Sequence, residues 1–488
     1  MNELSPDGLS VSPASLRDPA GCLLTFQGRL LRMIHKSWVP HVQAFLNSPV
    51  AQQWMESGRF VRARVLDALA VQPFLGDKQF RDWYEGADMG MVVEQEVVPF
   101  PSFPYEWTAP MLHDAGRLTL DLGLALLAEG LGLKDATPYN VLFRGPEPVF
   151  VDLLSVEQRD PCAPLWLPYA QFTRTFLLPL LAYRKFQMPL DQIFLTHRDG
   201  LEPSEFYQWC SPLERLLPPV LTLASIPTWF RTRADSIESS LYQPKRVREP
   251  AQSRFILESL LRRLKRTLGK LEPSRGRKSR WSDYMASPCS YEEEDFARKQ
   301  VFVQDALTEF RPQAVLDVGC NIGHFSLMAA RNGSRVVAID SDPEVAGEVW
   351  RRARAERLDI LPLAVHLSRP TPSVGWRNRE HPSFLDRARG RFEAVFLLAV
   401  LHHILVTDGI PLLEILDLAA ELTTKICVIE FVGPRDAMFR RLVRGRDELY
   451  AEMNPAAFEA ACGRRFRILR SCCLRTSERW LYLLEKKS

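Results

Sequence analysis

The chain has 488 residues, more than one ordinary hydrophobic core accommodates, so we expect two domains. Its hydrophobic fraction of 46% and charged fraction of 25% are typical of globular proteins, and a net charge of +3 gives no nucleic-acid-binding signature. No apolar run is long enough to span a bilayer, residues 1–21 lack the apolar core of a signal peptide, and the nine cysteines contain no CxxC pair. These features predict a cytoplasmic protein with reduced, mostly buried thiols and no metal site.

The first quarter of the chain begins with a polar segment and continues into mixed secondary structure. Residues 1–25 contain three prolines and are expected to form a flexible tail. Up to residue 100, the pattern predicts short strands at 28–34, 60–66 and 91–98 and a helix at 49–56. We find no glycine-rich phosphate loop and no internal repeat in this stretch.

A polar loop followed by a hairpin carries the chemistry of the first half. Apolar residues at helical spacing predict a long helix that ends near Gly130. A loop from Leu133 to Phe143, a Gly-Pro turn and a strand ending at Asp152 follow it. This arrangement resembles the catalytic core of protein-kinase-like phosphotransferases. The resemblance assigns Asp135 to the catalytic-loop acid and Asn140 and Asp152 to the magnesium ligands.

The same stretch departs from the kinase pattern in ways that leave its activity open. Asp152 is followed by two leucines rather than Phe-Gly, Lys134 replaces the expected arginine, and no lysine of the third strand is recognisable. The fold can therefore be inherited without phosphotransfer. An ordinary hairpin with polar loop residues is the alternative interpretation.

Residues 254–280 are the one strongly charged segment, with ten basic and two acidic residues. Five leucines between Leu257 and Leu271 alternate at four- and three-residue steps, which predicts one apolar helical stripe flanked by basic side chains. Such a helix either contacts an anionic surface or acidic partner, or docks its leucines on a neighbouring domain. The stripe is short for stable membrane anchoring, so we favour docking.

The second half is organised around a glycine-containing turn between a strand and a helix. Residues 314–318 read as a buried strand, and a helix opens near His324. Gly319 and Gly323 allow backbone angles and close approaches that other residues do not. A second apolar strand ends at Asp340, where a carboxylate is well placed to hold ribose hydroxyls.

This order of motifs, D-x-G-x-N-x-G, a helix and V-V-A-I-D, resembles the class I methyltransferases that use S-adenosyl-L-methionine (SAM). The competing interpretations are an α/β domain whose turn merely needs glycine and a NAD-binding domain, although the glycine spacing is not GxGxxG. The resemblance implies SAM as the cofactor, a glycine loop around its methionine part and an acid on its ribose. The cofactor-binding residues that it implies are Asp317, Gly319, Cys320, Asn321, Gly323, Asp340, Ser341 and Ala399.

The remaining strands fit the seven-stranded methyltransferase sheet, whose last strand is antiparallel. We expect them near 358–365, 392–398, 425–430, 465–474 and 479–485. Ligands of open α/β sheets bind beyond the carboxyl ends of the strands, which places Gly319, Asp340, His402 and Glu430 along one rim. His402 and His403 follow the fourth strand and are the candidate catalytic bases. Alternatively, one packs against the cofactor and the other begins a helix.

The predicted organisation is an α/β protein in which a Rossmann-like methyltransferase sheet follows an α+β kinase-like domain. The expected segments are a tail at 1–25, the kinase-like domain at 26–245, the basic helix and linker at 246–285 and the methyltransferase domain at 286–488. The whole chain resembles bacterial nodulation-protein-like methyltransferases. The favoured function is methyl transfer to an oxygen or nitrogen of a small metabolite or glycan. A bifunctional kinase–methyltransferase and a regulatory scaffold with degenerate sites are the alternatives.

Overall fold

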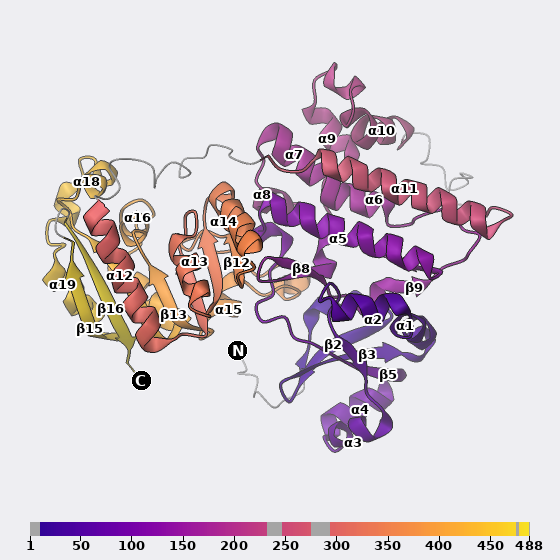
Figure 1. The fold of residues 1–488 in the computed structure, drawn as a ribbon, viewed down its shortest axis with the longest axis horizontal. Helices are drawn as coiled ribbons and strands as arrows, with labels where there is room; N and C mark the ends of the chain where they lie inside the picture. The colour runs from indigo at the N-terminus through magenta and orange to yellow at the C-terminus, as the bar shows by residue number, and fades with distance from the viewer. Residues whose placement is uncertain (1–9, 232–245, 275–292, 475–477, 488) are drawn as a thin grey trace.

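The computed structural model describes residues 10–231, 246–274, 293–474 and 478–487. Two parts lie side by side in Figure 1, the N-terminal half in indigo to magenta and the C-terminal half in orange to yellow. None of the described helices is long and apolar enough to cross a membrane.

An antiparallel five-stranded sheet forms the first lobe of the N-terminal half. Its order is β1-β2-β3-β5-β4, and its strands are β1 (Ser10–Val11), β2 (Gly21–Phe26), β3 (Arg29–His35), β4 (Ala63–Val65) and β5 (Met89–Gln95). Four helices accompany the sheet: α1 (Val39–Leu46), α2 (Pro49–Glu56), α3 (Ala68–Leu75) and α4 (Lys78–Gly86).

The prediction of a tail as far as residue 25 is corrected by β1 and β2. Leu24 and Phe26 are fully buried, and β2 pairs with β3 along its whole length. Gln27 and Gly28 both have positive φ angles, 48° and 72°, as a two-residue hairpin turn of type I′ requires. The apolar run before Gln27 is therefore one arm of a hairpin, which the three prolines upstream obscured in the sequence.

A helical lobe follows the sheet and is built around the long helix α5 (Ala109–Ala128). Two short antiparallel pairs follow it, β6 (Leu131–Leu133) with β9 (Val156–Gln158) and β7 (Val141–Arg144) with β8 (Glu147–Phe150). The other helices of the lobe are α6 (Tyr169–Phe172), α7 (Leu178–Phe186), α8 (Leu190–Phe194), α9 (Pro203–Trp209) and α10 (Ile226–Arg231). A small antiparallel sheet followed by this helical lobe is the predicted α+β kinase-like domain.

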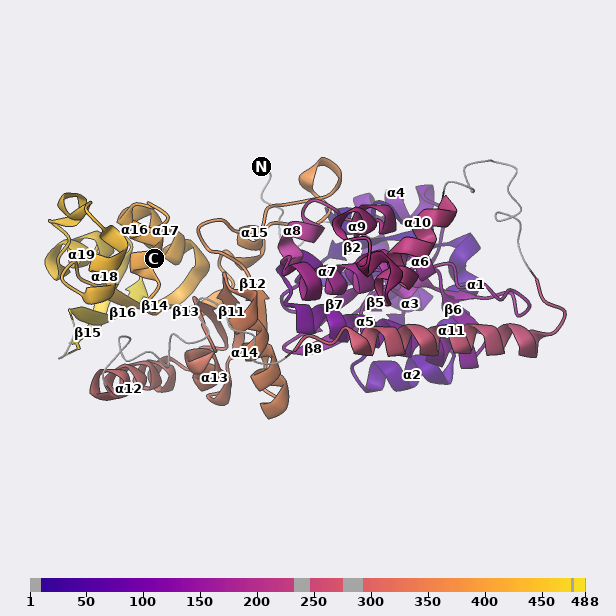
Figure 2. The same cartoon turned by 90° about the horizontal axis from the view of Figure 1, so that it is seen from above.

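The basic helix α11 (Pro250–Lys270) lies along α5 in both views (Figures 1 and 2). Its five stripe leucines are each at most 4% exposed. Gly116 and Gly123 of α5 leave room for Leu268 and Leu261, since an added Cβ would lie 3.3 and 3.7 Å from their side chains. The leucines thus dock within the N-terminal half, and the arginines and lysines of the helix face outward.

The C-terminal half contains a seven-stranded sheet, as the sequence predicted, and the structure shows its strand order to be β12-β11-β10-β13-β14-β16-β15. Its strands are β10 (Ala314–Val318), β11 (Arg335–Asp340), β12 (Ile360–Ala364), β13 (Phe392–Leu397), β14 (Thr423–Val432), β15 (Phe466–Cys473) and β16 (Arg479–Lys486). The first five are parallel, and β16 runs antiparallel to β14. Its helices are α12 (Glu293–Phe310), α13 (His324–Arg331), α14 (Pro343–Glu356), α15 (Phe384–Ala388), α16 (Leu401–Val406), α17 (Leu412–Leu422), α18 (Ala437–Val443) and α19 (Pro455–Cys462).

Continuous apolar strands explain why this sheet is covered on both faces. Residues Val315 to Val318 are all buried, although Asp317 interrupts the apolar run, and β13 and β14 show the same near-continuous burial. A strand that is apolar on both sides needs helices on both faces, as in doubly wound α/β folds.

The two halves share a packed junction. Trp350 of α14 donates from its indole N–H to the carbonyl of Pro146 at 2.9 Å, and Arg354 of the same helix pairs with Asp114 of α5. Arg387 of α15 forms a fully buried ion pair with Glu106, which precedes α5. These contacts fix the C-terminal sheet against the helical lobe, with α14 and α15 between them in Figures 1 and 2.

Candidate functional site

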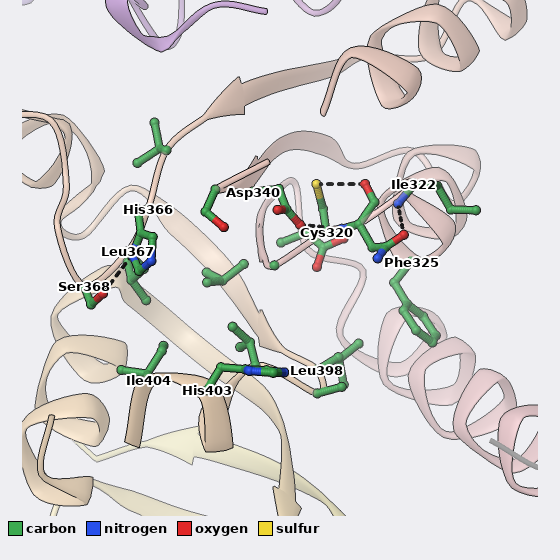
Figure 3. Close-up of a pocket in the computed structure, with 18 of the residues that line it drawn as sticks. Cys320, Ile322, Phe325, Asp340, His366, Leu367, Ser368, Leu398, His403 and Ile404 are labelled. Carbon is green, nitrogen blue, oxygen red and sulfur yellow. Dashed lines mark hydrogen bonds between the residues drawn. The ribbon is translucent and has the colours of Figure 1, made fainter. Parts of the chain in front are cut away.

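A cavity of about 310 Å³ opens at the carboxyl ends of β10, β11, β12 and β13. Residues at the strand ends, on α12 and α13 and on α16 line it, and Figure 3 shows them converging from several elements. This is the edge of an open α/β sheet at which ligands bind. Of the predicted site residues, Asp317, Gly319, Cys320, Asn321, Asp340, Ser341, Ala399 and His403 line the cavity.

Gly319 begins the loop that forms one wall of the cavity. Its φ angle of +68° lies in the left-handed region, and an added Cβ would come within 3.1 Å of the side chain of Val400, a neighbouring residue of the cavity lining. Its amide and that of Cys320 both donate to the carbonyl of Ile339, at 2.8 and 3.1 Å, which ties the loop to β11. Only glycine satisfies both the backbone angle and the narrow gap.

Gly323, also predicted to hold the cofactor, does not line the cavity. It is the N-cap of α13 with φ +81°, and a Cβ there would meet Val349 of α14 at 2.9 Å. Its role in the structure is close packing between two helices. The sequence pattern did not separate this role from cofactor contact because both require glycine.

Two buried carboxylates frame the loop. Asp340 accepts the backbone N–H of Asn321 at 2.9 Å on one oxygen and that of Asp342 at 2.9 Å on the other. Burial nevertheless raises the pKa of Asp340 to about 6. Asp317 accepts from the Ser326 hydroxyl at 2.5 Å, and burial raises its pKa to about 6 as well. A carboxylate oxygen accepts more than one hydrogen bond, so Asp340 keeps capacity for ligand hydroxyls.

The neighbouring histidines separate into one cavity residue and one core residue. His403 lines the cavity and is labelled in Figure 3. His402 is 1% exposed, lies outside the lining and has no hydrogen-bond partner for either ring nitrogen among the described residues. Burial, together with the nearby charges of His403 and Arg479, lowers the pKa of His402 well below its ordinary value. The predicted rim position of His402 is therefore corrected, because α16 turns its ring into the core.

Glu430, also predicted on the rim, instead belongs to a buried ion-pair network. Its carboxylate is 2.5 Å from Lys299 Nζ and 3.3 Å from Arg479, and Arg479 also contacts Asp436 at 2.9 Å. Lys299 lines the cavity and comes from α12, which precedes the glycine loop. Burial lowers the pKa of Lys299, with Glu430 acting in the opposite direction. Sequence analysis missed Lys299, although its place on the buried stripe of α12 was a signal.

A second polar group faces the cavity from the far wall. Ser368 and His366 Nδ1 are hydrogen-bonded at 2.8 Å, and His366 Nε2 lies 3.9 Å from Asp408. All three side chains line the cavity, and Figure 3 shows the Ser368–His366 bond. Burial lowers the pKa of His366, so the neutral imidazole predominates at neutral pH. Asp408 follows α16 and is 42 residues from His366 in sequence, which is why no local motif revealed the pair.

The residues that line the cavity fit SAM. A glycine stands where an added Cβ would press on Val400 of the cavity lining, an acid with spare acceptor capacity ends β11, and Lys299, already paired with Glu430, places its ammonium group in the lining. Ala399, at φ +58°, holds the loop after β13 in the left-handed region and lets its backbone face the cavity. Strained positions of this kind persist where the surrounding structure requires them, commonly at ligand sites.

The polar groups of Asn140 and Asp152 lie close together, but neighbouring side chains already occupy them with hydrogen bonds and an ion pair. The Ser155 hydroxyl donates to Asp152 at 2.5 Å and accepts from the Asn140 amide at 2.8 Å. Arg32 of β3 lies 3.1 Å from the same Asp152 carboxylate. Asp135 is half-buried, which raises its pKa, and Lys134 opposes this. The sequence shows no recognisable lysine in the third strand, and in the structure Arg32 of that strand contacts Asp152 instead.

These residues do not fit a magnesium ion. A guanidinium already neutralises Asp152, and Mg²⁺ needs carboxylate oxygens that are free to coordinate it. No group of three or more His, Cys, Asp and Glu side chains suited to a metal occurs among the described residues.

Known proteins match both the C-terminal half alone and nearly the whole chain. Residues 291–446 match the family model described as a methyltransferase domain. The nodulation protein NoeA of Rhizobium meliloti (strain 1021) is 28% identical over 474 residues, 97% of this chain and 95% of that protein. The 23S rRNA (uracil(1939)-C(5))-methyltransferase RlmD of Shewanella amazonensis (strain ATCC BAA-1098 / SB2B) is 32% identical over 85 residues, 17% of this chain and 19% of that protein.

Two solved structures resemble parts of the chain at low TM-scores. The N-methyltransferase NodS from Bradyrhizobium japonicum WM9 is 14% identical, with a TM-score of 0.30, over 41% of this chain and all of that chain. The bifunctional kinase-methyltransferase WbdD is 20% identical, with a TM-score of 0.30, over 40% of each chain. Residues 291–446 thus match a methyltransferase domain, and the C-terminal half that contains them has the seven-stranded sheet and the strand-end cavity of a fold that uses SAM as its cofactor.

Proposed function

We propose that the protein transfers the methyl group of SAM to an oxygen or nitrogen of a small metabolite or glycan. The observation that carries this proposal is one cavity that contains Gly319, Asp340 and His403 together. Glycine and acid are the residues that cofactor binding requires, and a histidine in the same cavity supplies a base. A cavity of about 310 Å³ is also within the range of small-molecule sites.

Each residue has a distinct task. The Gly319 loop and Asp340 bind the cofactor, and Lys299, held by Glu430, neutralises its carboxylate. Bound there, SAM supplies an electrophilic methyl group. His403 removes the proton from the attacking oxygen or nitrogen, a contribution that is typically 10²–10⁴-fold in rate. Ser368 and Asp408 fix the His366 ring on the far wall.

The N-terminal half presents the acceptor to this cavity. The support is the junction, in which Thr371 donates to Glu106 at 2.5 Å only two residues after Arg369, which lines the cavity. One wall of the cofactor cavity is thereby anchored on the kinase-like domain. An acceptor held by that domain would lie beside the chain segment that leads into the cavity.

The test is to incubate the purified full-length protein with methyl-labelled SAM and cell extract and to identify the labelled molecule. We expect label in a small metabolite or glycan, and His403→Ala should greatly reduce it. His366→Ala, which removes a histidine from another wall of the same cavity, is the matched control for His403→Ala. Label confined to protein or nucleic acid would contradict the proposed acceptor class, and absence of any transfer would favour the regulatory scaffold.

A bifunctional kinase–methyltransferase is the second candidate, and one observation favours it: Asp135, Asn140 and Asp152 do converge in the N-terminal half. The Arg32–Asp152 pair argues against it, since it competes with the metal that phosphotransfer needs.

A further inference from the structure

The segment between β12 and α15 extends away from the C-terminal sheet and contacts the kinase-like domain. Val374 and His381 exchange backbone hydrogen bonds at 3.0 and 3.2 Å, which closes a hairpin of residues 374–381. Gly375 has φ +88°, and a Cβ there would collide with Glu380 at 2.5 Å. This hairpin is therefore shaped to hold Glu380 and His381 at its end.

Glu380 lies between two arginines of the kinase-like domain. Arg17, from the loop between β1 and β2, donates to one carboxylate oxygen at 2.8 Å, and Arg198 lies 2.8 Å from the other. Glu380 is 3% exposed. Burial would raise its pKa, but hydrogen bonds from the Trp376 backbone and Arg17 and the charge of Arg198 lower it overall. It is the only carboxylate that pairs with either arginine in the described part of the chain.

Aromatic rings and polar atoms without partners surround this carboxylate. His381 stacks on Tyr139 at 5.1 Å between ring centroids and lies 4.5 Å from Phe103. Both nitrogens of His381, the hydroxyls of Tyr105 and Tyr139, and Arg198 Nε are buried without a hydrogen-bond partner among the described residues. His381 is only 6% exposed, and burial lowers its pKa to about 4.

Such a concentration of unsatisfied groups calls for an explanation. A buried polar group without a hydrogen bond destabilises the folded state, and native proteins contain few of them. Here five such atoms on four side chains gather around one ion pair at a domain junction. Their donors and acceptors match a small polar ligand better than they match one another.

We infer that Arg17 and Arg198, with Tyr105 and Tyr139, form a binding site for a small anion bearing a phosphate or carboxylate group, and that Glu380 occupies it as an internal ligand. Two guanidiniums converging on one carboxylate are a geometry that suits either anion. The nearest acids do not cancel the charge: Asp18 is held by Lys134 at 3.5 Å, and Glu106 is held by Arg387. Asp199 also lies close enough to influence Tyr139.

An internal ligand competes with any free one. Because Glu380 is part of the same chain, its effective concentration at the arginines is high, so the wild-type protein should bind free anions weakly. Removing the negative charge of Glu380 should release both arginines without changing the size of the side chain. The site does not depend on methyl transfer, and its failure would leave the proposed function unaffected.

The experiment is calorimetric titration of the full chain with inorganic pyrophosphate and, separately, with citrate. We expect Glu380→Gln to bind one of them at least tenfold more tightly than wild type, and the better ligand distinguishes phosphate from carboxylate chemistry. Adding Arg17→Gln or Arg198→Gln to Glu380→Gln should remove this gain. Unchanged binding in Glu380→Gln, or a gain that persists without the arginines, would overturn the inference.

Two controls make the result interpretable. Glu356→Gln removes an equivalent charge from an ion pair with Arg331 on the surface, and an equal gain there would reduce the effect to net charge and overturn the site. Binding of S-adenosylhomocysteine reports that the variants are folded. If Glu380→Gln does not fold, the test is Arg17→Gln in the otherwise wild-type chain. Arg17 is 60% exposed, so this variant is expected to fold. Loss of Arg17 must then weaken pyrophosphate binding below that of the wild type.

Discussion

At the residue scale, burial sets the charge of the groups that would hold the cofactor. Asp340 has its two oxygens on backbone N–H groups, yet burial raises its pKa to about 6. A raised pKa in the folded state means that the carboxyl's contribution to stability is present at acidic pH and is lost as pH rises through 6. Ligand binding has the opposite dependence, because the ionised form accepts hydroxyl hydrogen bonds more strongly.

We therefore predict that S-adenosylhomocysteine binds more tightly at pH 7 than at pH 5. A hydrogen bond to a charged group exceeds a neutral one by on the order of 1 kcal/mol, which corresponds to roughly fivefold in affinity. Asp340→Asn, which cannot ionise, should lose most of this dependence. Calorimetry at both pH values checks it, and equal affinities for the wild type would exclude Asp340 as an ionised partner.

The two adjacent histidines give a second prediction, since only one of them reaches the cavity. His403→Ala should lose roughly 10²–10⁴ in turnover and keep its affinity for SAM, as expected when a general base is removed. His402→Ala, the matched core variant, should mainly lower the melting temperature. Turnover assays and thermal denaturation of both variants measure this. Loss of SAM affinity in His403→Ala would indicate a packing role instead.

How much of the site the sequence predicts depends on how local each interaction is. Gly319 and Asp340 were predictable because each lies at the end of its own strand in a recognisable pattern. Lys299 was not, because its partner Glu430 is 131 residues away. Arg32 was missed for the same reason, since its contact with Asp152 joins two lobes.

At the element scale, the sequence of α11 predicts its apolar face but not the element that this face contacts. The leucine spacing predicted a helix with one apolar face, and the structure adds that α5 covers that face. The basic residues counted in sequence are accounted for as the outer face of a docked helix. The first strand pair shows the opposite outcome. Its polar, proline-containing sequence predicted a flexible tail, but the hairpin turn at Gln27 and Gly28 pairs β2 with β3.

Docking of α11 predicts how the helix responds to substitution. Leu264 is 3% exposed, so Leu264→Ala should lower the free energy of unfolding by about 2–5 kcal/mol through lost burial and a cavity. The adjacent Arg263 is exposed, and Arg263→Ala should change the free energy of unfolding by less than about 0.5 kcal/mol. Denaturant titration distinguishes them, and similar small effects in both would mean that the helix does not depend on its leucines.

At the scale of the whole molecule, the junction makes the two halves interdependent. Thr371, Glu380 and Arg387 all belong to the segment that follows the cavity wall, and all contact the kinase-like domain. The kinase-like half therefore anchors the segment that follows the cavity wall, while the residues that line the cavity all come from the C-terminal half. Two domains were predictable from the sequence but this junction was not, since it joins distant residues such as Thr371 and Glu106, which are 265 positions apart.

The kinase-like half should bind magnesium and ATP weakly or not at all. Arg32 and Ser155 already occupy the Asp152 carboxylate, and phosphotransfer needs that carboxylate on the metal. The check is a magnesium-dependent ATP titration of the wild type beside Asp152→Asn. Tight binding that the variant loses, or ATP turnover that requires Asp135, would make the protein bifunctional.

The central claim is that the cavity beside Gly319 binds the cofactor, and calorimetry with S-adenosylhomocysteine tests it most directly. Gly319→Val introduces a branched side chain at a position where an added Cβ alone would lie 3.1 Å from Val400. Gly333→Val is the matched control, because Gly333 has φ +92° and nothing lies within 4 Å of its Cβ position, so it shares the backbone strain without the obstruction. We predict binding by the wild type and Gly333→Val and none by Gly319→Val with its fold intact; equal affinity in all three would contradict the account.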